Sequence, residues 1–254
     1  MIEVKNLSAS YKDKTVFKNV SFTLSDSSFT ALCGKNGSGK STLLSLMAGI
    51  VPAGLKVDGE ILVDGENVFL IKRKDAAKKI SFLVQNESPV WNLTVMQFVQ
   101  TGLYAFDSMR AVDAESAVRG ILSELGIAEF EEKKIFELSG GEFQKCRLAR
   151  CMIQKNNNML FDEPSEGLDM PFQIQFLKTI KAIATPNGKT VLFSIHDINT
   201  ASIMADNFLL FSHGTVIVGN HKKIFDQEIL ENAFETSVSI YSHPKLKKPQ
   251  IMFV

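Results

Sequence analysis

Short apolar runs alternate along the chain with stretches in which apolar residues recur every three or four positions. The short runs predict β-strands, and they lie at residues 2–7, 22–24, 29–33, 59–63, 80–84, 159–161, 190–195, 207–211 and 215–218. The second pattern predicts helices at residues 41–48, 172–184 and 198–205. Strands that alternate with helices are typical of a mostly parallel sheet covered by helices, so we expect an α/β fold.

The pattern changes between residues 95 and 154. Glu, Ala, Leu and Arg dominate there and proline is absent, which favours about three helices. We interpret this block as a helical insertion beside the sheet. Near the end of the chain, Lys245, Lys247 and Lys248 are expected to lie on a solvated tail.

Composition limits the class of protein. Of the 254 residues 45% are apolar, enough for a sizeable core, and this excludes a generally disordered chain. Lys plus Arg and Asp plus Glu are balanced at 28 each, so no overall field attracts nucleic acid and we expect no nucleic-acid partner. No apolar run reaches the roughly 18 residues that a membrane-spanning helix needs. Cys33, Cys146 and Cys151 are expected to be buried, reduced thiols.

Residues 34–41 read Gly-Lys-Asn-Gly-Ser-Gly-Lys-Ser and match the pattern Gly-x4-Gly-Lys-[Ser/Thr] of a phosphate-binding loop. Glycine lets consecutive backbone N–H groups turn toward phosphate oxygens, and the helix that follows directs its positive N-terminus at the same anion. Lys40 would neutralise the β- and γ-phosphates, and the Ser41 hydroxyl would bind Mg²⁺. The candidate nucleotide ligands in this loop are Gly34, Asn36, Gly37, Ser38, Gly39, Lys40, Ser41 and Thr42.

Two carboxylates, Asp162 and Glu163, follow the apolar run at 159–161. Because successive strand residues point to opposite faces, we expect the two acids to have different tasks, one toward a metal and one toward an attacking water. Many strands end in solvated acids, and that ordinary interpretation is the stronger one for this pair alone. The phosphate-binding loop upstream reverses the preference.

The segment Leu-Ser-Gly-Gly-Glu at 138–142 precedes a helical pattern. Ser139 and Glu142 have the spacing of a capping box, which would make the segment only the start of a helix. Two glycines after the cap would also leave helix amides uncovered, so that a phosphate could reach them. The residues alone leave both interpretations open.

Three motifs in this order, the loop at 34–41, the segment at 138–142 and Asp-Glu-Pro at 162–164, resemble those of the ATP-binding cassette (ABC) family of ATPases. Ser139 lies 23 positions before Asp162, as the family pattern implies. The resemblance implies an ATPase that uses ATP and Mg²⁺.

The resemblance implies roles for four further residues, each of which would be an ordinary surface or hydrogen-bonded side chain if it stood alone. Tyr11 is similar to the aromatic residue that stacks on adenine, and Gln85 to the glutamine that contacts the metal and the water. Asp169, at the end of the loop 165–169, is similar to the aspartate that contacts a partner subunit. His196 is similar to the histidine that contacts the γ-phosphate.

The resemblance also assigns the chemistry. Ser41, Gln85 and Asp162 would hold the metal ion. Glu163 would orient or deprotonate the attacking water, and His196 and Gln85 would complete the catalytic set.

Two small departures from the family pattern stand out. Polar residues at 156–158 precede the two acids where the family has an apolar strand, so we expect this strand to start late. Phe143 stands where the family often has a long polar side chain. Neither departure removes a catalytic group.

The fold that the resemblance implies is a P-loop NTPase core with a mostly parallel sheet, an N-terminal antiparallel β region and an inserted helical subdomain. We expect one ABC ATPase domain over residues 1–254. It would comprise a core lobe at about 1–85 and 156–225, a helical lobe at about 86–155 and a C-terminal extension at about 226–254.

The resemblance implies a homodimer, or a pair with a close relative, in which the phosphate-binding loop of one chain and Ser139, Gly140 and Gly141 of the second chain close over one ATP. In the uptake branch of the family, the ATPase is a peripheral subunit at the cytoplasmic face of the membrane. There it drives a permease, which in turn meets a substrate-binding protein.

The segment from Asn86 to Ala105, which includes Trp91 and Phe98, would form the groove that receives the permease, and ordinary packing of its apolar residues is an equally weighted alternative. Residues 93–104 and the tail at 233–251 resemble importers of iron-siderophore, haem and cobalamin substrates, so we expect such an importer. A soluble ABC ATPase in a cytosolic assembly, such as iron–sulfur cluster biogenesis, is the second hypothesis. An unrelated P-loop kinase would leave residues 138–142 without a role.

Overall fold

Two large β-sheets organise the chain, and the computed structural model describes residues 1–12, 14–88, 91–106 and 111–254. Within these residues the strands are β1 (Ile2–Tyr11), β2 (Lys14–Leu24), β3 (Phe29–Cys33), β4 (Leu55–Val63), β5 (Glu66–Asn67), β6 (Ile80–Leu83), β7 (Asn158–Phe161), β8 (Thr190–Ser194), β9 (Asn207–Ser212), β10 (Thr215–Gly219), β11 (Val238–Ser242) and β12 (Pro249–Phe253). The α-helices are α1 (Lys40–Met47), α2 (Arg73–Ala77), α3 (Val95–Gln100), α4 (Ala111–Glu124), α5 (Gly140–Met152), α6 (Met170–Ala184), α7 (Ile198–Met204), α8 (His221–Ile224) and α9 (Gln227–Phe234). Short 3₁₀ turns lie at Thr101–Leu103, Ala128–Phe130 and Ile135–Glu137.

The larger sheet has the strand order β10-β9-β3-β8-β7-β6. Its strands from β9 to β6 run parallel, and β10 pairs antiparallel with β9 at the edge. The second sheet, of order β2-β1-β4-β5, is antiparallel throughout. The expected mostly parallel sheet and N-terminal antiparallel region are therefore confirmed. Because the carboxyl ends of parallel strands share one edge, the segments after β3, β7 and β8 meet there.

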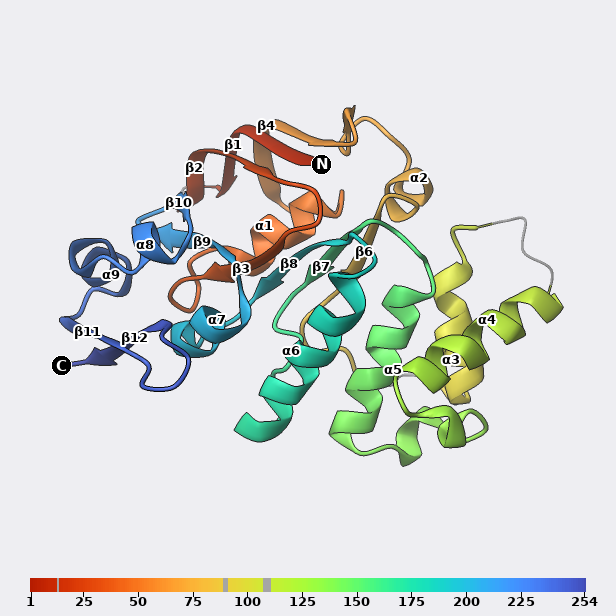
Figure 1. The fold of residues 1–254 in the computed structure, drawn as a ribbon. Coiled ribbons are helices and arrows are strands. Elements are labelled where there is room, and N and C mark those ends of the chain that lie inside the picture. The colour runs from red at the N-terminus through yellow and green to blue at the C-terminus, as the bar shows by residue number, and fades with distance from the viewer. Residues whose placement is uncertain (13, 89–90, 107–110) are drawn as a thin grey trace.

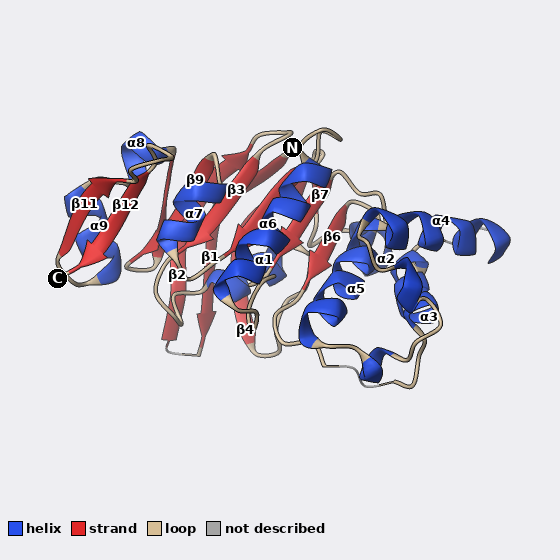
Figure 2. Ribbon diagram, turned by 60° about the horizontal axis from the view of Figure 1, so that its bottom comes forward, coloured by secondary structure: helices blue, strands red, loops and turns tan. Residues whose placement is uncertain are grey.

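The apolar core lies on both faces of the parallel sheet. Leu32, Leu160 and Leu192 belong to the cluster that packs against α1 and the antiparallel sheet. Their neighbours Ala31 and Phe193 belong to the cluster formed with α5, α6 and α7. Successive strand residues thus enter different cores, which explains why these strands read as continuous apolar runs. Figure 2 shows α6 and α7 lying across one face of the sheet.

The helices α3, α4 and α5 lie together at one end of the molecule, beside the parallel sheet (Figure 1). Phe98 on α3 packs against Phe143 on α5, with ring centroids 5.5 Å apart. The Arg150 guanidinium lies 4.5 Å from the centroid of the same Phe98 ring. The predicted helical insertion is confirmed, and the apolar Phe143 has a place in its packing.

Several predicted boundaries were wrong. Strands β1 and β2 are longer than the predicted 2–7 and 22–24, because they pair with each other from Ile2 opposite Leu24 to Tyr11 opposite Lys14. Their polar outer residues hid this pairing, since backbone hydrogen bonds need no apolar side chain. The charged segment at 71–79, where no element was predicted, contains α2.

Strand β7, which precedes the two acids, begins at Asn158, one residue before the predicted start and after the first two of the polar residues 156–158. The Asn158 side chain is buried, and its Nδ2 donates a hydrogen bond to the carbonyl oxygen of Lys79 at 3.3 Å. The amide nitrogen therefore has a partner inside the fold, whereas the buried Asn158 Oδ1 has none among the described residues, and the apolar pattern reveals neither.

The tail folds into more structure than the sequence pattern suggested. Helices α8 and α9 and the hairpin of β11 and β12 follow β10. Asn199 on α7 holds the hairpin, because its Nδ2 donates to the carbonyl oxygen of Ile251 at 3.0 Å. Lys245 and Lys247 are exposed, as expected.

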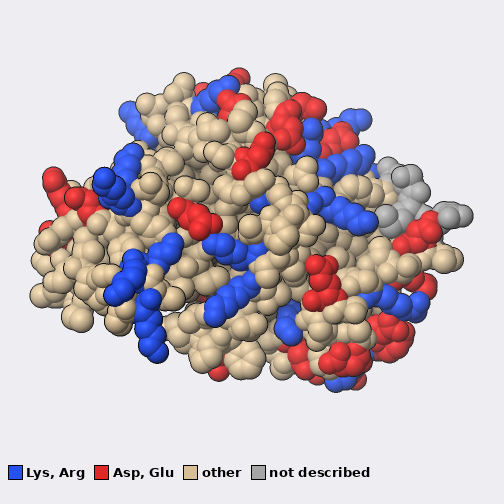
Figure 3. Space-filling model, in the orientation of Figure 1, with Lys and Arg blue, Asp and Glu red and all other residues tan. Residues whose placement is uncertain are grey.

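Among the described residues, no helix combines the length and the apolar character needed to cross a membrane. On the face drawn in Figure 3, acidic side chains gather over the end that carries α3 and α4, whereas Lys and Arg side chains are spread over the rest of this face. Cys33, Cys146 and Cys151 are buried and unpaired, as predicted.

Candidate functional site

The phosphate-binding loop connects β3 to α1 at the carboxyl edge of the parallel sheet. Gly34, Gly37 and Gly39 adopt φ values of 144°, 74° and 107°, which disfavour residues with a Cβ. Space is also limited, because a Cβ at Gly34 would lie 2.8 Å from the Phe211 Cβ. The glycines are therefore required by this fold, as the motif predicted.

Lys40 is the first residue of α1, and it is buried. Its Nζ donates to the carbonyl oxygens of Gly34 at 2.9 Å and Lys35 at 3.1 Å, so the side chain folds back over its own loop. Burial lowers the pKa of Lys40, and the carboxylates of Glu163 and Asp162 act in the opposite direction. An ammonium group held in this way beside the loop is suited to anionic oxygens.

Ser38 supplies an independent sign that the loop is built for a polar ligand. Its hydroxyl oxygen is buried and has no hydrogen-bond partner within the described part of the chain. Buried polar groups are normally paired, so an unpaired hydroxyl in this loop fits a site for phosphate oxygens.

Two neighbouring strands position the acids. Ser194, at the end of β8, is fully buried, and its hydroxyl donates to Asp162 Oδ1 at 2.7 Å. The same Ser194 oxygen accepts a hydrogen bond from the backbone N–H of Glu163 at 2.8 Å. Sequence reasoning missed Ser194, because nothing in the local pattern distinguishes it from any polar residue at the end of a strand.

Glu163 does not continue the strand, which ends at Phe161. Its φ of 48° lies in the left-handed region. We expected strand alternation to point the two acids to opposite faces, and this reason was wrong. The chain turns at Glu163, and the turn rather than strand alternation separates its carboxylate from that of Asp162.

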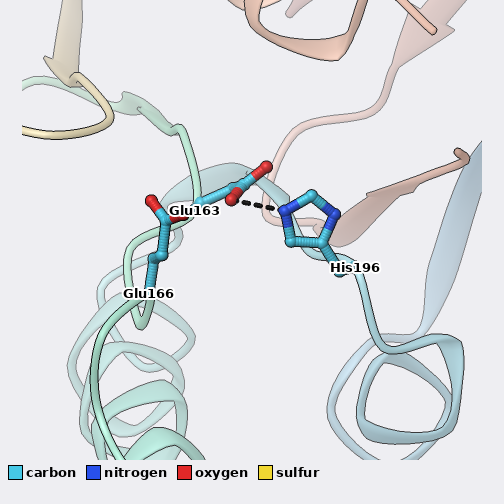
Figure 4. A group of neighbouring side chains, drawn as sticks. All are labelled: Glu163, Glu166 and His196. Atoms are coloured by element: carbon cyan, nitrogen blue, oxygen red, sulfur yellow. Dashed lines mark ion pairs between the residues drawn. The ribbon is translucent and has the colours of Figure 1, made fainter. Parts of the chain in front are cut away.

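The Glu163 carboxylate lies at the centre of a cluster of polar side chains (Figure 4). Its Oε2 is 2.6 Å from His196 Nε2 and accepts a hydrogen bond from Gln85 Nε2 at 3.0 Å. Gln85 Nε2 also donates to Glu166 Oε2 at 2.9 Å. Burial raises the pKa of Glu163, although the neighbouring His196 acts in the opposite direction. A carboxylate with a raised pKa is a better proton acceptor, as a general base needs to be.

These groups surround one cavity of about 440 Å³. The predicted residues that line it are Tyr11, Asn36, Gly37, Gly39, Lys40, Ser41, Thr42, Gln85, Glu163 and His196. The structure adds Lys14, Thr15, Val16 and Glu166, which sequence reasoning missed. The first three belong to β2, which follows Tyr11 in the chain. No motif records that β2 lies beside the phosphate-binding loop.

The other predicted site residues are not in the wall of this cavity; they are Gly34, Ser38, Ser139, Gly140, Gly141, Asp162 and Asp169. Ser139 caps α5 in a complete capping box, in which its hydroxyl accepts from the Glu142 N–H at 3.4 Å and Glu142 Oε2 accepts from the Ser139 N–H at 2.7 Å. Asp169 caps α6 by accepting from the Phe172 N–H at 3.1 Å. Gly140 lines a separate cavity of about 240 Å³, which Glu163 and Glu166 also border. The capping box predicted from the spacing of Ser139 and Glu142 is confirmed.

The oxygen donors near the phosphate-binding loop fit a magnesium ion. Ser41 supplies a hydroxyl, Gln85 a carboxamide oxygen and Asp162 a carboxylate. Hard oxygen donors of these kinds are the ligands that Mg²⁺ takes in proteins, where it also keeps waters and phosphate oxygens. The residues present therefore suit the metal.

The segment predicted to receive a permease contains both buried and exposed aromatic side chains. Phe98 is buried between α3 and α5, so ordinary packing accounts for it. Trp91 and Tyr104 are 66% and 88% exposed. Residues 89 and 90 of the segment lie outside the described residues.

Comparison with known proteins gives a consistent result. The family model described as "ABC transporter" matches residues 17–166. The petrobactin import ATP-binding protein YclP of Bacillus subtilis is 31% identical over 242 residues, which cover 94% of this chain and 95% of that protein. The hemin import ATP-binding protein HmuV of Idiomarina loihiensis is 32% identical over 257 residues, which cover 98% of this chain and 96% of that protein.

Among solved structures, the dimeric structure of a bacterial ABC transporter cassette superposes with a TM-score of 0.74 at 25% identity. The superposition covers 87% of this chain and 98% of that one. The range that the family model matches contains the phosphate-binding loop, residues 138–142 and both acids.

Proposed function

This chain belongs to the ABC transporter family, and on that premise we propose that it is the ATP-hydrolysing subunit of an importer for iron-siderophore or haem substrates. The observation that carries the proposal is the meeting of the phosphate-binding loop, Glu163 and His196 around one cavity. The substrate class rests on the names of the relatives, which import petrobactin and hemin.

In this proposal, the residues around the cavity bind the nucleotide and its metal ion. The loop amides and Lys40 hold the phosphates, and the half-exposed Tyr11 stacks on the adenine ring. Ser41, Gln85 and Asp162 hold Mg²⁺, which when bound neutralises charge on the phosphate oxygens. Asp162 is kept in place by its hydrogen bond from Ser194, so its carboxylate needs little reorganisation.

In this proposal, the side chains clustered around Glu163 catalyse hydrolysis. Its carboxylate orients the attacking water and accepts a proton from it, and burial makes that carboxylate a stronger base. His196, paired with Glu163 at 2.6 Å, stabilises charge on the γ-phosphoryl group. Positioning and charge stabilisation of this kind supply most of the catalysis in phosphoryl transfer.

We infer a homodimer in which Ser139, Gly140, Gly141 and Asp169 act on the nucleotide of the second copy. Ser139 begins α5 and Asp169 begins α6, whereas the phosphate-binding loop leads into α1, which supports a role of the two residues in another site. Both residues cap helices whose N-termini bear partial positive charge, and such ends attract phosphate. The solved cassette to which this chain is similar is itself a dimer.

The remaining assignments complete this proposal. The chain works as a peripheral subunit at the cytoplasmic face of the membrane, it meets a substrate-binding protein only indirectly, and its exposed Trp91 and Tyr104 contact a permease. It divides into a core lobe at about 1–85 and 156–225, a helical lobe at about 86–155 and a C-terminal extension at about 226–254. The gathering of α3, α4 and α5 at one end supports the helical lobe (Figure 1).

A substitution at Glu163 tests the hydrolytic assignment. Glu163→Gln removes the base while keeping the shape, so turnover of magnesium-ATP should fall by about two orders of magnitude while ATP binding persists. The matched control Glu129→Gln replaces an exposed glutamate on another surface and should hydrolyse ATP like the wild type. Steady-state phosphate release and equilibrium nucleotide binding measure the two effects. Brisk turnover by Glu163→Gln would refute the assignment.

Co-purification tests the transport role. An affinity-tagged chain expressed in its own cells should bring down a membrane protein with several spans. Recovery of the chain only in a soluble complex would support the second hypothesis, a cytosolic assembly, and would contradict the importer.

A further inference from the structure

Glu166 has no task in the mechanism above, yet its carboxylate stands in the catalytic cluster. It lies on the loop between β7 and α6. One carboxylate oxygen of Glu163, one of Glu166 and one ring nitrogen of His196 all lie within 4.8 Å of one another. Figure 4 shows both carboxylates and the imidazole around the same point. The Glu166 carboxylate accepts a hydrogen bond from Gln85 Nε2 at 2.9 Å, and this contact ties it to the proposed chemistry.

The carboxamide of Gln85 has two different ends. Its nitrogen carries two hydrogens and only donates, whereas its oxygen only accepts and can bind a metal ion. In the structure both hydrogens are used, one toward Glu163 Oε2 at 3.0 Å and one toward Glu166 Oε2 at 2.9 Å. The carboxamide oxygen is therefore the end that remains for a cation.

The opposite orientation of the amide is disfavoured by the same two acids. A flipped Gln85 would place its oxygen about 3 Å from two carboxylate oxygens, where acceptors repel one another. Glu163 alone would hold the amide less firmly, because its Oε2 is shared between Gln85 and His196. Glu166 adds a second acceptor, and two acceptors determine the direction of the amide.

We propose that Glu166 is a positioning residue, which holds the Gln85 carboxamide so that its oxygen faces the magnesium site and its nitrogen faces the acids. This inference rests on the proposed function, since it takes Gln85 as a metal ligand. Glu166 itself touches neither metal nor nucleotide in this scheme. It needs an acceptor oxygen at the end of a side chain of this length, and it does not need the negative charge.

A spectroscopic measurement on the protein without nucleotide tests the contact directly. In protein labelled with ¹⁵N-glutamine, the side-chain amide signal of Gln85 is identified by its loss in Gln85→Glu. In the wild type this signal should be shifted from that of a solvated glutamine and should exchange slowly with solvent. Glu166→Ala should move it to the solvated position, and the control Glu129→Ala should leave it unchanged.

Kinetics tests the consequence. Partners that orient metal ligands are typically worth about 10- to 100-fold in metal affinity or activity. Glu166→Ala should therefore raise the half-saturating Mg²⁺ concentration of ATP hydrolysis by about tenfold, while the affinity for ATP measured without metal stays the same. Glu166→Gln keeps an acceptor oxygen at the same distance and should recover most of the lost magnesium affinity.

The outcomes separate this inference from the proposed function. A wild type that does not hydrolyse ATP overturns the proposed function, and the amide signal then still reports on the contact between Glu166 and Gln85. An active wild type with an unchanged amide signal and unchanged magnesium dependence in Glu166→Ala overturns this inference alone. Glu166→Gln as impaired as Glu166→Ala would also overturn it, because the charge would then be what matters.

Discussion

At the scale of single residues, the backbone of Glu163 decides what its side chain can do. A φ of 48° in a residue other than glycine costs free energy, of the order of 1 kcal/mol or more. The hydrogen bond from its N–H to the buried Ser194 hydroxyl offsets part of that cost. This strained backbone conformation directs the Glu163 carboxylate toward His196 and Gln85, so the strain has a role in the proposed site.

His221 illustrates a residue whose surroundings set its protonation. Its ring packs edge-on against Phe208 at a centroid distance of 4.8 Å and stacks on Phe225 at 5.9 Å. Its Nε2 lies 2.7 Å from the carbonyl oxygen of Ser202, so this nitrogen carries the proton. Burial lowers the pKa of His221, and the hydrogen bond to Ser202 opposes this effect only in part.

A pH dependence of stability follows. Because the pKa of folded His221 lies below its unfolded value of 6.5, the neutral ring contributes fully to stability above pH 6.5. That contribution is lost as the pH falls below 6.5 and through the folded pKa. In urea unfolding between pH 8 and 5, the wild type should therefore lose stability relative to His221→Leu. Parallel pH profiles would contradict this, and His213→Asn, at an exposed histidine, provides the control.

At the scale of elements, the contact between the 3₁₀ turn after α3 and helix α5 depends on one glycine. A Cβ at Gly102 would lie 2.3 Å from the carbonyl oxygen of Arg150 and 2.8 Å from Ile153 Cγ2. Backbone cannot move aside as a flexible side chain can, so the two segments would have to separate. Gly102 thus sets how closely α3 and α5 approach.

Substitution of this glycine is a direct test. Gly102→Ala should lower the free energy of unfolding by about 1–3 kcal/mol, the usual cost of overpacking. Gly120, inside α4, has nothing within 4 Å of an added Cβ. Gly120→Ala should instead raise it by about 0.5–1 kcal/mol through helix propensity. Urea denaturation measures both, and equal effects of the two substitutions would show that the close contact is unimportant.

At the scale of the whole molecule, the proposed ATP site is divided between two copies of the chain. The cavity at the phosphate-binding loop holds Lys40, and Ser139 lies elsewhere at the start of α5. Under this proposal a single chain has both halves of a site without joining them. Dimerisation would be required for hydrolysis under this arrangement.

Mixing two inactive variants tests the division. Lys40→Ala removes the phosphate ligand, and Ser139→Asp keeps a helix cap while adding a charge that repels phosphate. Each variant alone should be inactive. In mixed dimers, the intact loop of one chain meets the intact Ser139 of the other, so equal mixing should restore about a quarter of the wild-type sites. No recovery in dimers shown to have exchanged would contradict action across the interface.

The sequence by itself determined those features that depend on residues close together in the chain. The phosphate-binding loop, the capping box of Ser139 and Glu142, and the apolar runs of β3 and β8 are of this kind. Their geometry follows from local dihedral preferences and from hydrogen bonds across a few residues, which a motif records. The resemblance to a family added order and spacing, from which Gln85 and His196 became candidates.

Only the tertiary structure decided which distant groups meet. Gln85 and Glu166 are 81 positions apart, and Ser194 and Asp162 are 32 apart, so no local pattern encodes either hydrogen bond. The same holds for the entry of Asn158 into β7, which depends on a carbonyl group 79 positions away. Contacts of this kind arise when parallel strands align their ends, the carboxyl ends at the site and the amino ends at Asn158, because packing of the sheet, and not proximity in the chain, sets the distances between side chains.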